Sequence, residues 1–125
     1  MNPKNLLRSL ALFALLTAPL LHADAGKKVK ISGHLVDVSC ATEQKDDPNY
    51  MRTQHSKECF QMPKCVKSGF AVLTSDDRVL KFDAAGNELA KKLIAASDKS
   101  KDWRIKVRGK MDGELLHVTR LQLER

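Results

Sequence analysis

The chain has 125 residues, of which 42% are hydrophobic and 30% charged, and a formal net charge of +7 at pH 7. This length suits one small domain with a single core and a stability on the order of 5–10 kcal/mol. The basic residues are scattered along the chain, which favours solubility over nucleic-acid binding as the reason for the charge.

Residues 1–25 have the layout of a secretory signal peptide. Two basic residues precede an apolar run at 10–21, and small residues stand at the two positions that a signal peptidase inspects. The run is shorter than the roughly 20 apolar residues that span a bilayer, which argues against a stable membrane anchor. We expect cleavage near Ala25 and export of residues 26–125 as one periplasmic or secreted domain.

The remaining chain predicts five strands and one strong helix. Asp83 is a plausible N-cap for that helix, and Asp112-Gly113 is a two-residue hairpin signal. In chain order we expect a strand at 29–38, a hairpin at 69–82 that turns at 75–77, the helix at 83–97, and a second hairpin from strands at 103–111 and 114–123.

Alternation along the strand at 103–111 separates its two faces. Trp103, Ile105 and Val107 point one way, while every second residue is basic and lies on the opposite, solvated face. The basic residues of that face are Arg104, Lys106, Arg108 and Lys110.

The element order predicts the fold class. Five strands with one helix between the third and fourth match the five-stranded Greek-key barrel called the OB-fold. Gly33 in the first strand suggests the bulge or bend at which such a strand turns a corner. We therefore expect a mainly β (α+β), OB-like barrel, with a general α+β sandwich as the competing architecture.

Residues 39–68 form a long insertion between the first two strands. A connection of this length is usually functional and carries structure of its own. Asp47 followed by Pro48 predicts a helix start, and the helix is expected to run to about Phe60 and to end before Pro63.

The insertion holds a candidate metal site. On the expected helix, His55 and Cys59 are four residues apart and share one face, with Met51 four residues earlier. Cys40 at the start of the insertion and Cys65 near its end complete a set of three thiols and one imidazole. Such a Cys₃His set suits zinc.

Copper is the alternative ion. Met51 and Met62 would favour copper(I), which prefers thiolate and thioether ligands. Asp37 is a candidate to orient a metal ligand from outside the coordination sphere, or it simply ends the first strand.

A disulfide is the competing interpretation of the cysteines. Exported domains use disulfides to fasten long loops, and a Cys40–Cys65 or a Cys59–Cys65 bond would do so here. A Cys40–Cys65 bond would contribute about 3–4 kcal/mol by the chain-entropy estimate. Either bond leaves one thiol over. A thiol-based redox role is a third interpretation, although no C-x-x-C pair is present.

The segments "GHLVDVSC", "HSKECFQMPKC" and "SGFAVLTSDDRVLKF" resemble a group of small, exported, OB-like bacterial proteins. The shared pattern is G-x-L-V-D-x-x-C followed by H-x-x-x-C and a third cysteine. The resemblance implies that Cys40, His55, Cys59 and Cys65 act as a matched set, and it implies no reaction.

Together these observations predict an exported, non-enzymatic domain that binds zinc or copper through its insertion. The alternative is a disulfide-stapled module that binds a protein or small ligand. In neither case do we expect nucleic acid as a partner.

Overall fold

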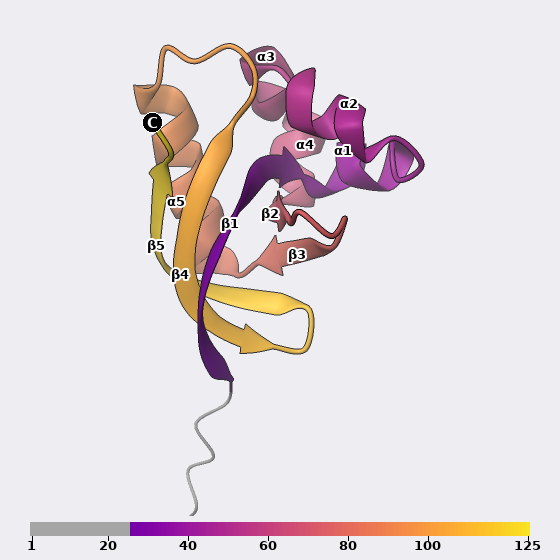
Figure 1. Cartoon of the computed structure of the whole chain (residues 1–125). Coiled ribbons are helices and arrows are strands. Elements are labelled where there is room, and N and C mark those ends of the chain that lie inside the picture. Colours follow the sequence, from indigo (N-terminus) through magenta and orange to yellow (C-terminus); the bar gives the residue numbers. More distant parts are fainter. Residues whose placement is uncertain (1–25) are drawn as a thin grey trace, which may run out of the picture.

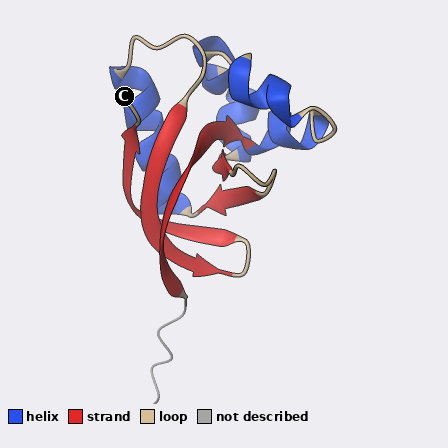
Figure 2. Cartoon of the chain, in the orientation of Figure 1, coloured by secondary structure: helices blue, strands red, loops and turns tan. Residues whose placement is uncertain are grey.

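The computed structural model describes residues 26–125, and its five strands form a closed barrel (Figures 1 and 2). Neighbouring strands follow the order β1-β2-β3-β5-β4, and β4 returns to β1. All pairs are antiparallel except β3 with β5, which is parallel. This mixed five-stranded barrel is consistent with the OB-like prediction. The strands are β1 (Lys27–Asp37), β2 (Phe70–Leu73), β3 (Val79–Phe82), β4 (Arg104–Asp112) and β5 (Leu115–Leu123).

Five helices accompany the barrel in the described part of the chain. Four short ones lie between β1 and β2 and gather at the end of the barrel where β1 ends (Figure 1). The fifth lies between β3 and β4 and packs against β5. The helices are α1 (Val38–Glu43), α2 (Pro48–Thr53), α3 (Lys57–Gln61), α4 (Pro63–Ser68) and α5 (Ala84–Ala96).

β1 bends at Gly33, as the sequence predicts. The strand pairs with β4 as far as His34, and from His34 onward it pairs with β2. A Cβ atom on Gly33 would lie 2.4 Å from the backbone oxygen of Leu73, so only glycine permits this close approach. The ladder irregularity itself is elsewhere, between Arg108 and Gly109.

The second hairpin differs from the prediction by one residue. Asp112 is the last residue of β4 and pairs with Leu115, so the two-residue loop is Gly113–Glu114. Gly113 has φ +60, the left-handed conformation that glycine adopts without steric cost.

The helix predicted from Pro48 to about Phe60 is wrong in its length, because the chain forms two helices there. Asp47 caps α2 as expected, but the helix ends at Thr53. Ser56 then starts α3, because its side chain accepts a hydrogen bond from the backbone N–H of Cys59. His55 therefore lies between two helices and does not share a helical face with Cys59.

α3 is anchored to the barrel by Phe60. The Phe60 ring packs edge-on against Trp103, with centroids 5.3 Å apart, and lies 6.0 Å from the ring of Phe70. Because these partners stand at the starts of β4 and β2, α3 covers that end of the barrel. Phe60 belongs to the main hydrophobic core, whose other buried members are Leu35, Phe70, Val72, Leu80, Phe82, Ala90, Ile94, Trp103, Ile105, Val107, Leu116 and Val118.

α5 begins at Ala84, so its first turn includes Gly86, a residue with low helix propensity. A Cβ atom on Gly86 would lie 2.6 Å from a methyl carbon of Val118, so glycine lets the first turn approach β5 closely. The side chain of Asn87 accepts a hydrogen bond from the backbone N–H of Phe70, 2.8 Å away. Tertiary contacts thus offset the low helix propensity of both residues.

Among residues 26–125, no helix has the length and apolar character needed to span a membrane. The predicted signal peptide, residues 1–25, lies outside the described residues.

Asp83 joins α5 to β5. Its carboxylate accepts hydrogen bonds from the backbone N–H groups of Gly86 (2.9 Å) and Val118 (3.1 Å) and lies 3.3 Å from the ring of His117. Burial alone would raise the pKa of Asp83, but the two backbone N–H groups and His117 outweigh it, so the pKa lies below its usual value.

We expect Asp83→Ala to lower the free energy of unfolding by about 2 kcal/mol at pH 7. Because the folded-state pKa is lowered, this stabilisation is present above the unfolded-state pKa and is lost as the pH falls through the folded-state value. Urea denaturation from pH 7 down to about pH 2.5 should therefore show the gap between wild type and variant closing below about pH 4. Glu88→Ala on the same helix is the control, and because it removes only an exposed pair with Lys91 it should lower the free energy of unfolding far less than Asp83→Ala does. A difference between wild type and Asp83→Ala that does not change with pH would contradict the prediction.

Candidate metal centre

The two ends of the insertion are fastened to each other. The backbone N–H of Val38 donates to the carbonyl of Gly69 (3.0 Å), and that of Ser39 donates to the hydroxyl of Ser68 (3.1 Å). The same Ser68 hydroxyl donates to the backbone oxygen of Cys65. These bonds bring the start of α1 beside α4 and so bring Cys40 near Cys65.

Asp37 stands where the barrel passes into the insertion. It is the last residue of β1 and the N-cap of α1, and its Oδ1 accepts a hydrogen bond from the backbone N–H of Cys40 (2.8 Å). Its side chain has no solvent exposure (0%). A buried carboxylate needs hydrogen-bond donors or a cation nearby, because removal from water is costly for a charge.

Asp37, Cys40 and Cys65 form one cluster. One carboxylate oxygen and the two sulfur atoms all lie within 4.8 Å of one another. Cys65 is buried and Cys40 is half-buried. Ligand atoms of three residues therefore converge on one place, and Cys40 and Cys65 are two of them.

His55 reaches this cluster through Asp37. Its Nε2 lies 2.7 Å from Oδ2 of Asp37, and its side chain is only 2% exposed. The imidazole is held in place by Phe60, whose ring packs edge-on against it with centroids 4.3 Å apart.

The contact between His55 and Asp37 is close but poorly aligned. Neither Nε2 of His55 nor Oδ2 of Asp37 makes a hydrogen bond of acceptable geometry with any described residue, although both atoms are fully buried. Buried polar atoms without such a bond are rare in folded proteins. His55 is not among the three residues whose ligand atoms lie within 4.8 Å of one another, so it adjoins the cluster through its contact with Asp37.

The carboxylate is ionised and the thiols are protonated. Burial alone would raise the pKa of Asp37, but His55 and the Cys40 backbone N–H outweigh it and hold the pKa below its usual value. Burial, the Asp37 carboxylate and the neighbouring Cys65 raise the pKa of Cys40 to about 12. Burial and the Asp37 carboxylate also raise the pKa of Cys65. Thiols in this state are weak nucleophiles.

The remaining predicted ligands lie outside the cluster. Cys59 is half-buried on α3, and its sulfur contacts the hydroxyl of Ser56 at 3.4 Å. Met51 is buried in a small apolar cluster with Val36 and its neighbours, whereas Met62 is 52% exposed. Cys59 is thus not one of the three clustered residues, although it lies near enough to Cys65 to act on its charge, and Cys40 packs against the apolar cluster that holds Met51.

Asp37 was predicted either to orient a metal ligand or simply to end the first strand, and it is the last residue of β1. A carboxylate oxygen of Asp37 also lies among the candidate ligand atoms. The signal was available, because an Asp three residues before a cysteine at the end of a strand has the spacing of an N-cap. The edge-on packing of Phe60 on His55 had no sequence signal, since it depends on the helix break at Gln54–Ser56.

No family model, curated protein or solved structure matches the chain.

A double-mutant cycle tests the buried pair. In the presence of a metal chelator, His55→Leu should lower the free energy of unfolding by about 3 kcal/mol, because it leaves the Asp37 carboxylate buried without its partner. Adding Asp37→Asn should then cost less than it does alone, with a coupling energy of about 1–3 kcal/mol measured by urea denaturation.

The pair His34–Asp102 provides the matched control. Its atoms lie 3.0 Å apart, but the Asp102 side chain is 54% exposed, so the cycle of His34→Leu with Asp102→Asn should give a coupling of about 0.5 kcal/mol or less. Coupling of equal size in the two cycles would refute a special role for the buried pair.

Proposed function

We propose that the domain binds one transition-metal ion, zinc or copper, through Asp37, Cys40, His55 and Cys65. The observation that carries the proposal is the Asp37–Cys40–Cys65 cluster, whose carboxylate is fully buried and has His55 Nε2 2.7 Å away. A cation at this place would compensate the charge of the buried Asp37 carboxylate. This set keeps three members of the predicted Cys₃His site and replaces Cys59 with Asp37.

The chemistry of the donor set supports zinc or copper. Thiolate sulfur and imidazole nitrogen are preferred ligands of both ions, and a carboxylate oxygen is common in zinc sites. Binding to the two cysteines would require both thiols to lose their protons. Four protein ligands that are buried or half-buried suit an ion that fastens the insertion to the barrel, worth on the order of 10 kcal/mol for structural zinc.

The wider proposal is an exported, non-enzymatic, OB-like Greek-key domain. The raised pKa values of Cys40 and Cys65 support weak nucleophilicity of these two thiols in the unbound protein. The layout of residues 1–25 supports export to the periplasm or beyond the cell.

One observation favours a second candidate, a disulfide-stapled binding module. Cys40 and Cys65 have sulfur atoms within 4.8 Å of each other, at the two ends of the insertion that backbone hydrogen bonds already fasten. A Cys40–Cys65 bond would hold the same two helices together without metal, and Cys59 would be the remaining thiol.

Metal titration separates the two candidates. Protein purified without reducing agent should contain three thiols that react after denaturation and should bind one equivalent of Zn²⁺ in isothermal titration. Cys40→Ser and Cys65→Ser should each weaken zinc binding by more than about 100-fold, because outer-shell losses alone cost 10–100-fold. Competition with copper(I) then identifies the preferred ion.

Cys59→Ser is the matched control, since the residue lies outside the cluster. It should leave zinc affinity unchanged within about threefold, a small difference by the logarithmic relation of affinity and free energy. One reactive thiol per chain and no zinc binding would establish the disulfide instead. Loss of binding in Cys59→Ser alone would return the site to the cysteine set predicted from the sequence.

A further inference from the structure

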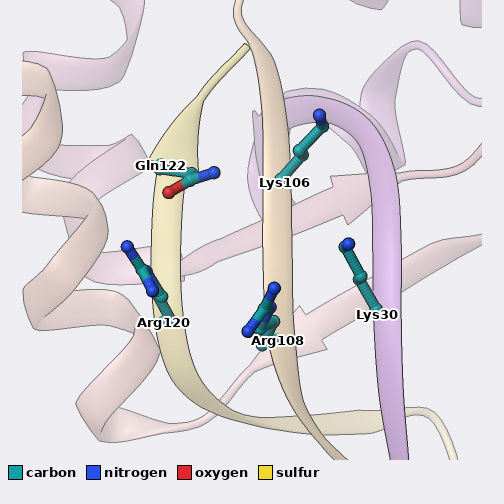
Figure 3. Close-up of a pocket in the computed structure, with 5 residues that line it drawn as sticks. All are labelled: Lys30, Lys106, Arg108, Arg120 and Gln122. Atoms are coloured by element: carbon teal, nitrogen blue, oxygen red, sulfur yellow. The ribbon is translucent and has the colours of Figure 1, made fainter.

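A basic hollow of about 160 Å³ lies on the outer face of β1, β4 and β5, away from the cysteines. Figure 3 shows its side chains rising from three neighbouring strands, with Arg108 on the middle strand between Lys30 and Arg120. Four of the five lining residues are cationic. The lining residues are Lys30, Lys106, Arg108, Arg120 and Gln122.

The strand register places like charges directly opposite one another. Lys30 of β1 pairs with Arg108 of β4, and Arg108 pairs in turn with Arg120 of β5. Like charges in this arrangement destabilise a sheet. The three residues therefore lower the stability of the unliganded barrel, and this cost is offset when an anion lies between them.

Acidic neighbours supply little compensation at this place. Within residues 26–125, Lys106 approaches one carboxylate, that of Glu124, at 3.9 Å, and Lys30, Arg108 and Arg120 form no ion pair. Glu124 is itself engaged by the hydroxyl of Ser32. The hollow thus has a net positive charge and unused hydrogen-bond donors.

We propose that this hollow binds a small anion that carries at least two phosphoryl groups. The two guanidinium groups offer planar, forked donors that match phosphoryl oxygens, and the Gln122 amide adds a neutral donor. Neighbouring strands are about 4.8 Å apart, so Lys30 and Arg120 stand roughly 10 Å apart across three strands. A linked pair of phosphoryl groups spans this row with the side chains extended, whereas a single group would require both long outer side chains to converge on it at a cost in side-chain entropy.

Nucleic acid fits the hollow less well. Single-strand binding depends on aromatic side chains that stack with the bases, and no aromatic residue lines the hollow. Membrane attachment also lacks support, because no large apolar side chain lines it.

Titration with inorganic pyrophosphate at low ionic strength tests the site. Isothermal calorimetry should show saturable 1:1 binding, and orthophosphate should bind at least tenfold more weakly. Arg108→Gln and Arg120→Gln should each weaken pyrophosphate binding about tenfold or more, the effect expected for one charge-assisted hydrogen-bonded contact. Lys92→Gln removes the same charge from exposed α5, outside the hollow, and should change affinity less than about twofold.

The melting temperature measured without ligand gives a second readout. This readout does not depend on which anion the hollow binds. Without pyrophosphate, Arg108→Gln should melt about 2 °C higher than wild type, since it relieves repulsion on both sides. With pyrophosphate, wild type should gain more in melting temperature than the variant.

Three results would overturn the proposal. They are absence of saturable pyrophosphate binding, equal weakening by Lys92→Gln, and a lower melting temperature of Arg108→Gln in the absence of anion. Binding of single-stranded DNA or of vesicles containing phosphatidylglycerol, with no binding of pyrophosphate, would assign the hollow to a macromolecular partner instead.

Discussion

The buried carboxylate of Asp37 is the interaction on which the candidate centre depends. It is the last residue of β1 and the N-cap of α1, and its carboxylate contacts the imidazole of His55, which lies in the middle of the insertion. An ionised carboxylate without solvent contact is costly, so the groups around it are constrained to compensate its charge. The Asp37 side chain thereby links the end of the barrel to the positions of Cys40 and Cys65.

The insertion maintains this geometry through contacts with the barrel rather than through helix propensity. Its four helices have five or six residues each, too short to be stable alone. Phe60 places α3 in the main core, and Lys57 bonds to the carbonyls of Ser97 and Ser100 through its ammonium and its backbone N–H. His55 is immobilised as a result, because it directly precedes Ser56, the N-cap of α3, and packs on Phe60. A rigid frame of this kind suits ligand atoms that must hold fixed positions.

Local signals predicted the barrel well and the centre incompletely. Alternation gave the long strands, Gly33 gave the bend of β1, and Asp47 and Asp83 gave two helix starts, since each of these depends on residues close in sequence. The break after Thr53 was missed although Ser56 is an N-cap residue by type, and the packing of Phe60 against Trp103, a contact between distant parts of the chain, holds the second helix in place. The row formed by Lys30, Arg108 and Arg120 could not be predicted from the sequence either. The alternation of charges along β4 is readable from sequence, but their alignment with Lys30 and Arg120 requires the strand register.

The parallel pairing of β3 with β5 determines when the barrel can form. β5 is the last strand, and it fills the gap between β3 and β4 in the ring. Before it is available, β3 presents an open edge, and the core side chains Leu116 and Val118 are missing. Closing the barrel therefore depends on pairings between segments far apart in sequence, which form more slowly than the local hairpins.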